Sequence, residues 1–216
     1  NFNYNFNEIE KRRIIMSKAL DMARELVKQL EEVEKKNKVR LSELKPRETF
    51  KIGEHDFIVL DQDGSSQTTK VISKEFMAED VVFDRNTKDY NKSSLKKMIE
   101  ADIQPIIENA LGAENLVEHK VNLTSVDMQH EFEDCVCKVR PITFDETRKY
   151  NDLLVNKDLG DWWWTCTPWS TKERGWEYSM AVVSPSGNFI NHFYDNDGGV
   201  RPFCILKSHI FVSKGE

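Results

Sequence analysis

The chain has 216 residues, of which 39% are hydrophobic and 31% are charged, and its formal net charge is −6. These values suit one large globular domain, or one domain with an appendage, and they argue against the basic surface that strong nucleic-acid binding requires. No apolar run approaches the roughly 18 residues that cross a membrane. Residues 1–15 lack the apolar core of a secretory signal, so we expect neither a membrane partner nor signal-dependent secretion.

The first fifteen residues are predicted to lie outside the folded protein. The sequence Met16-Ser-Lys-Ala resembles a natural start. Purine-rich codons for the preceding Lys11-Arg12-Arg13 would resemble a bacterial ribosome-binding site. Residues 1–15 are therefore expected to be a translated leader or an ordinary charged extension, and to be disordered in either case.

Residues 16–38 are predicted to form an amphipathic helix. The apolar residues Met16, Leu20, Ala23, Val27 and Leu30 recur at spacings of four and three, as in a coiled-coil seam. Further apolar residues widen this stripe, which suits packing in a bundle or on a domain better than a two-stranded coil. Two outcomes stay open, namely docking of the helix on its own domain and homo-oligomerisation through Met16–Val33.

The middle of the chain alternates strands with short helices. Residues 49–52 and 57–60 flank a Gly-Glu-His-Asp turn and predict a hairpin, which is followed by a strand at 69–72. Ser93 or Ser94 caps a short helix, and Pro105 fits the first turn of another that ends near Gly112. Residues 135–142 are predicted to form a strand. Thr143 and Glu146 have the spacing of a capping box that opens a helix to about residue 153.

The final third returns to strands, predicted at residues 178–183, 189–194 and 200–206. Short helices between strands that pair mainly with sequence neighbours indicate an α+β fold. The segment Asp161–Cys204 contains all five tryptophans of the chain. Clustered tryptophan is typical either of an aromatic core or of a recognition surface. Trp162, Trp163 and Trp164 would alternate between the two faces of an extended segment, so at least one of them is expected in the core. Trp163 and Trp164 are assigned structural roles.

Motifs for catalysis and metal binding are missing from the sequence. None of the five histidines lies in a zinc-protease motif, and neither a hydrolase elbow nor a phosphate-binding loop occurs. Cys135 and Cys137 would share one face of a strand, which suits buried packing. Residues 195–199 contain oxygen ligands but lack the distal Glu of an EF-hand, so a turn is favoured. We therefore expect no catalytic residue, metal or cofactor.

Arg201 stands between apolar residues of a predicted strand, where a buried arginine usually has a carboxylate partner. The candidates for that partner are Asp161, Asp195 and Asp197. Arg201 is assigned a structural role on this basis.

The segment Trp163-Trp164-Thr165-Cys166-Thr167-Pro168 and the closing Gly199-Val200-Arg201-Pro202 resemble an uncharacterised bacterial and prophage domain family. That family carries a Trp-Trp-Leu-Arg-Ser-Pro segment and a Gly-Val-Arg-Pro ending, and the resemblance extends over residues 44–212. It implies a C-type-lectin-like fold of the formylglycine-generating-enzyme type. The oxidases of that fold need a paired Cys directly after Gly-Phe-Arg, whereas Cys204 lies two residues further along and no second Cys follows.

The resemblance also implies where a ligand would bind. In the diversified binding proteins of this fold, the last strands and loops form the ligand surface. The matching residues here are Trp169, Trp176, Asn188, Asn191, His192, Tyr194, Asp195, Asn196 and Asp197. Small polar residues and tyrosine are typical of adaptable binding surfaces.

The expected function is therefore non-catalytic recognition of a protein or glycan, in a phage or prophage setting. The expected location is the bacterial cytoplasm or a phage particle. Two alternatives remain, namely a thiol- or metal-dependent oxidase-like enzyme using Cys166 and Cys204, and an assembly protein acting through the helix at residues 16–38. The sequence does not identify the ligand.

Overall fold

The computed structural model describes residues 2–36 and 38–215, with side chains described for residues 12–30 and 38–215. The chain divides into two compact units, Asn1–Lys38 and Val39–Glu216. The first unit contains one helix, α1 (Phe2–Lys36). Residues 2–15, which were predicted to lie outside the folded protein, form the first part of this helix. The physical reason is that neither proline nor glycine occurs before Pro46, so nothing in the sequence breaks the helix upstream of Met16.

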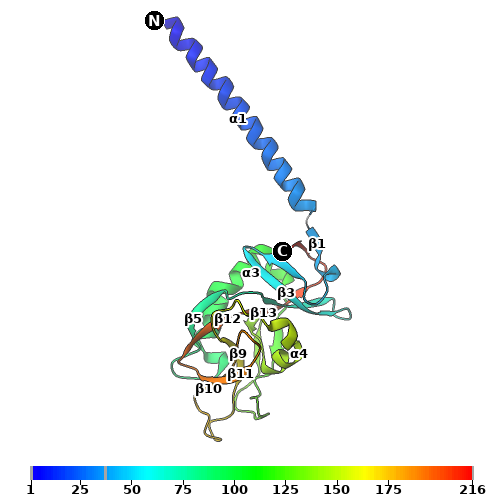
Figure 1. Cartoon of the computed structure of the whole chain (residues 1–216), viewed down its shortest axis with the longest axis vertical. Coiled ribbons are helices and arrows are strands. Elements are labelled where there is room, and N and C mark those ends of the chain that lie inside the picture. Colours follow the sequence, from blue (N-terminus) through cyan, green and yellow to red (C-terminus); the bar gives the residue numbers. More distant parts are fainter. Residues whose placement is uncertain (1, 37, 216) are drawn as a thin grey trace. The chain divides into compact units, whose positions relative to one another are not determined.

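The second unit is a mixed α+β domain, as predicted at the level of α+β (Figure 1). Within residues 38–215 the strands form a seven-stranded, a five-stranded and a two-stranded sheet. The seven-stranded sheet has the order β1 (Lys38–Arg40), β14 (Phe211–Lys214), β2 (Thr49–Ile52), β3 (His55–Asp63), β4 (Thr68–Ser73), β13 (Pro202–Lys207), β8 (Val139–Pro141). The five-stranded sheet has the order β11 (Phe189–Phe193), β10 (Ser179–Val183), β9 (Trp163–Pro168), β12 (Asp197–Val200), β5 (Ala78–Val82). The two-stranded sheet pairs β6 (His119–Val121) with β7 (Cys135–Cys137).

The helices of the domain begin and end where local signals place them. Ser93 caps α2 (Ser94–Met98), which continues through a π-helical turn at Ile99–Ile103 into α3 (Gln104–Leu111). Pro105 has no backbone N–H to donate in the usual i→i−4 pattern. The turn before Pro105 is accordingly wider, with the i→i−5 hydrogen bonds of a π-helix. The capping box of Thr143 and Glu146 opens α4 (Phe144–Leu154), as predicted.

Two predicted strands are each split between sheets. Residues 135–142 divide into β7 and β8, and residues 200–206 divide at Arg201 into the end of β12 and β13. The chain therefore leaves the five-stranded sheet and enters the seven-stranded sheet at Arg201. Hydrophobic pattern alone does not show such a change of sheet, because both halves are buried.

Candidate functional site

The first tryptophans of the Trp-rich segment lie in the core. Trp163 and Trp164 are fully buried on β9, and Trp164 Nε1 donates to the Val81 carbonyl at 2.7 Å. Gly199 on the neighbouring strand must be glycine, because a Cβ there would lie 2.5 Å from the ring of Phe76. These residues hold the five-stranded sheet together and are not available to a ligand.

Arg201 is fully buried, and within residues 38–215 no acidic side chain pairs with it. Its Nε donates to the Ser73 carbonyl at 3.0 Å and its Nη1 to the Leu154 carbonyl at 2.8 Å, and the guanidinium lies 4.8 Å from the Trp163 ring centroid. Leu154 is the last residue of α4, where the carbonyls carry partial negative charge. Burial lowers the pKa of Arg201 to about 9. The predicted carboxylate partner is wrong, since backbone carbonyls take its place; the candidates had been Asp161, Asp195 and Asp197.

Cys166 and Cys204 lie in the core. All four cysteines are free and buried. Burial raises the pKa of the Cys166 thiol to about 12 and also raises the pKa of Cys204, whereas a nucleophile or metal ligand must be a thiolate. Among the described residues no group of three or more His, Cys, Asp or Glu is placed to hold a metal ion.

A polar cavity of about 160 Å³ lies beside the start of α4, between Arg140, Thr143 and Glu146. Arg140 binds both carboxylate oxygens of Glu146 at 2.7 Å, and its Nε donates to His119 Nε2 at 3.0 Å. Sequence patterns did not reveal this cluster, because Arg140 and His119 come from separate strands. Arg140 thereby ties Glu146 in the first turn of α4 to His119 on β6, and the cluster fixes the start of the helix.

The residues predicted to bind a ligand are only partly brought together. Trp169 and Trp176 form a tilted ring pair 6.3 Å apart, and Trp176 is 41% exposed. Tyr194 is only 8% exposed and belongs to the core, so its place on an open surface is wrong. The reason is that its backbone N–H donates to the Tyr178 carbonyl and its ring packs on the Tyr178 ring, 5.8 Å away.

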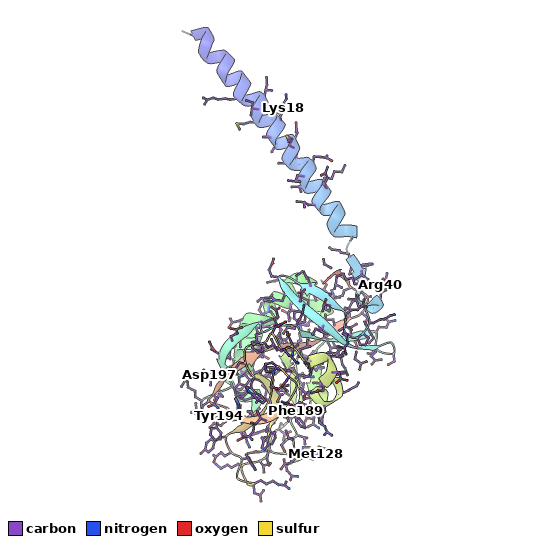
Figure 2. The ribbon with its side chains drawn as sticks, viewed as in Figure 1. Lys18, Arg40, Met128, Phe189, Tyr194 and Asp197 are labelled. Carbon is purple, nitrogen blue, oxygen red and sulfur yellow. The ribbon has the colours of Figure 1, made fainter. Side chains whose placement is uncertain are left out.

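The remaining predicted residues lie on β11 and the turn after it. Asn188 precedes the strand and is exposed, whereas Asn191 and His192 lie within it and are partly buried. The ring of His192 packs on Trp162 at 5.7 Å. The turn residues are exposed, and the last of them starts β12; they are Asp195, Asn196 and Asp197. Figure 2 labels Phe189 at the start of β11, Tyr194 directly after it and Asp197 at the start of β12.

Three exposed apolar residues of this region were missed. Tyr178 is 52% exposed, Phe193 is 55% exposed and Ile190 is 41% exposed. Tyr178 lies directly before β10, and its carbonyl accepts from the Tyr194 backbone N–H at 2.8 Å. An edge strand often leaves its apolar residues uncovered, so knowing that β11 is an edge would have pointed to these residues. The strand order that makes β11 an edge is not visible in the sequence.

A buried lysine fixes the loop at residues 169–178, hereafter the Trp176 loop. Lys88 Nζ donates to the carbonyls of Ser170 at 2.6 Å and Trp176 at 2.8 Å, and it pairs with Glu131 at 2.8 Å. Glu131 belongs to a second loop, which runs beside the Trp176 loop below β10 in Figure 1. The exposed Trp176 ring is therefore presented by a loop that has a rigid anchor.

The outer edge of β11 carries unpaired backbone groups. β10 and β11 pair antiparallel, with Ala181 opposite Asn191. The hydrogen bond from Tyr194 N to Tyr178 O shows that the even-numbered residues of β11 point their backbone N–H and C=O groups toward β10. The odd-numbered residues Phe189, Asn191 and Phe193 thus point their N–H groups away from the sheet. Within residues 38–215 these three N–H groups have no hydrogen-bond partner.

The other sheet edges have the features that normally prevent further pairing. β1, β8 and both strands of the two-stranded sheet, β6 and β7, are three residues long; β1 is charged, and β8 ends in Pro141. β5 contains two acidic residues, of which Asp80 has a positive φ of 53°, and its pairing with β12 is irregular. β11 has five residues in regular pairing, without Pro, Lys, Arg, Asp or Glu. It is the least protected edge of the described part of the domain.

Comparison with protein-family models, with curated proteins and with solved structures gave no match. Among the described residues, no helix is both long enough and apolar enough to span a bilayer.

Proposed function

We propose that the chain is a non-catalytic recognition domain that binds an extended polypeptide segment along β11. The observation that carries the proposal is the row of outward N–H groups at Phe189, Asn191 and Phe193 on an unprotected edge. Adding a strand to such an edge is a common mode of peptide recognition, in which main-chain hydrogen bonds supply affinity and alternate side chains supply specificity.

Apolar side chains accompany this edge. Ile190 and Phe193 project from β11 itself and are largely exposed. Tyr178 lies beside the end of the strand, and Trp176 lies two residues before Tyr178 on its anchored loop. Aromatic side chains provide large contact areas at low entropic cost, so they are suited to covering the side chains of an added strand.

The sequence left a protein and a glycan open as ligands, and the edge of β11 favours the protein. A strand presents donors and acceptors at a regular spacing of every second residue, and only another extended polypeptide repeats that spacing. A glycan would use the aromatic faces and would leave the backbone row of β11 without partners.

The resemblance to the prophage domain family supports the same class of function. We assign the domain to the C-type-lectin-like fold on the two motifs that bound the segment Trp163–Pro202 and on the mixed α+β architecture. On this assignment β11 belongs to the C-terminal strands and loops that bind ligands in related proteins. The proposed setting is a phage or a prophage-carrying bacterium.

An oxidase-like thiol enzyme is not favoured. Its two cysteines, Cys166 and Cys204, are fully buried, and the pKa of each thiol is raised by burial. A substrate would have to open the core before it could reach either sulfur.

The test separates backbone recognition from side-chain recognition at one position. A display library of random peptides is selected on the full chain, and the selected peptides are titrated against Asn191→Pro and Asn191→Ala. Proline removes the outward N–H of residue 191 without breaking the ladder with β10, and alanine keeps that N–H. We expect Asn191→Pro to weaken binding about tenfold or more, because a hydrogen bond is lost and the added strand is displaced.

Asn191→Ala is expected to bind within about threefold of the wild type, because the main-chain donors remain. Near-ultraviolet circular dichroism should show that both variants stay folded. Equal binding by the two variants, equal loss in both, or failure to select any peptide would each contradict the proposal.

A further inference from the structure

The apolar stripe of α1 is exposed along the whole part for which side chains are described. Met16 is 72% exposed, Leu26 is 58% exposed and Leu30 is 56% exposed. Helices in proteins take most of their stability from packing of their apolar face, so a helix of 35 residues with this surface needs a partner. The pattern of the stripe indicates which partner that is.

The stripe contains two interleaved seams. The first follows spacings of four and three and consists of Met16, Leu20, Ala23, Val27 and Leu30. The second follows the same spacings and consists of Ala19, Ala23, Leu26, Leu30 and Val33. A two-stranded coiled coil uses one seam at positions a and d. Two seams that share members allow each helix to pack on two neighbours at once, which requires at least three helices.

The first seam continues upstream in the sequence. Counting back from Met16 by three and four gives Arg13, Ile9, Phe6 and Phe2, so three of these four positions are apolar. α1 begins at Phe2 without a break. The apolar phase of the first seam in the sequence thus continues over residues 2–15.

Apart from Ile14, the described face opposite the two seams is polar. Asp21 and Arg24 form an ion pair at 3.6 Å, and Gln29 donates to Glu25 at 3.5 Å. Such a face remains in water when the seams are covered. We infer that α1 associates with copies of itself in a bundle of three or more helices. This inference is independent of the proposed peptide recognition.

Sedimentation equilibrium of the full chain tests the inference. The wild type is expected to have the mass of three or more chains. Val27→Lys places a charge in the first seam only, and Leu26→Lys places one in the second seam only. We expect Val27→Lys to dissociate to monomers and Leu26→Lys to fall to dimers or monomers, because a buried lysine is costly and the second neighbour is lost.

Ile14→Lys is the matched control. Ile14 is 51% exposed and belongs to neither seam, so the same substitution should leave the mass of the assembly unchanged. Tryptophan fluorescence verifies that the domain stays folded, because all five tryptophans lie in the unit Val39–Glu216. A monomeric or dimeric wild type, an unchanged Leu26→Lys variant, or dissociation of Ile14→Lys would each overturn the inference.

Discussion

His119 is held in one neutral tautomer by its neighbours. Its Nε2 accepts from Arg140 Nε at 3.0 Å, so the proton is on Nδ1, which donates to the Val117 carbonyl at 3.1 Å. Burial, followed by the positive charge of Arg140, lowers the pKa of His119 to about 4. Protonation would break the contact with Arg140 and place two positive charges side by side.

The stability of the domain should consequently depend on His119 in mildly acidic solution. In the unfolded chain His119 binds this proton near the ordinary histidine pKa of about 6.5, whereas in the folded chain it binds the proton only near pH 4. The contribution of neutral His119 to the free energy of unfolding is therefore complete above about pH 6.5 and is lost as the pH falls towards 4. We expect a loss on the order of 2 kcal/mol in urea unfolding across this range. His119→Gln should lack this part of the pH dependence, and an NMR pKa near 6.5 for His119 would contradict the argument.

Sequence reasoning at the scale of single residues succeeded where neighbours along the chain decide the outcome. The capping role of Thr143 and Glu146 was predicted because both partners lie within one helical turn. The partners of Arg201 were predicted wrongly, because they lie 128 and 47 residues away and are backbone carbonyls. Side-chain chemistry suggested a carboxylate there, and only the fold shows that two element ends supply the acceptors.

Among the elements, the hairpin of β10 and β11 was predicted from its alternation and its turn, whereas its position at the edge of the sheet was not. The parallel pairing of β12 with β9 and the antiparallel pairing of β12 with β5 set the strand order. These contacts join segments that are far apart in the sequence. The predicted site therefore included residues of β11 but not its exposed residues Ile190 and Phe193.

The Trp176 loop is the element whose rigidity depends on one side chain. Lys88→Met would leave the carbonyls of Ser170 and Trp176 without their donor and Glu131 without its partner. We expect amide exchange in residues 170–178 to accelerate by about tenfold or more, since each lost buried contact costs about 1–3 kcal/mol, while the sheets stay protected.

Lys172→Met is the control for that experiment. Lys172 pairs with Glu177 on the same loop, but both side chains are largely exposed, and such pairs contribute little. Exchange in residues 170–178 should then stay close to that of the wild type. If Lys88→Met and Lys172→Met gave the same exchange, the loop would not depend on the buried lysine.

For the whole molecule, the two proposals assign the helix and the domain different contributions to binding. The β11 edge would set the affinity of one site, and a bundle of α1 would set how many sites one particle carries. Linked sites raise the effective concentration of the second contact without any new interaction. The two contributions can be separated because the seams of α1 and the edge of β11 share no residue.

On a surface densely coated with a selected peptide, we expect the wild type to dissociate about a hundredfold more slowly than Val27→Lys. On a sparsely coated surface the two proteins should dissociate at the same rate, because each then uses one site. Ile14→Lys should behave as the wild type at both densities. Biosensor dissociation rates measure this directly. Equal rates for wild type and Val27→Lys on the dense surface, with the wild type assembled, would show that the sites of one bundle cannot engage neighbouring peptides together.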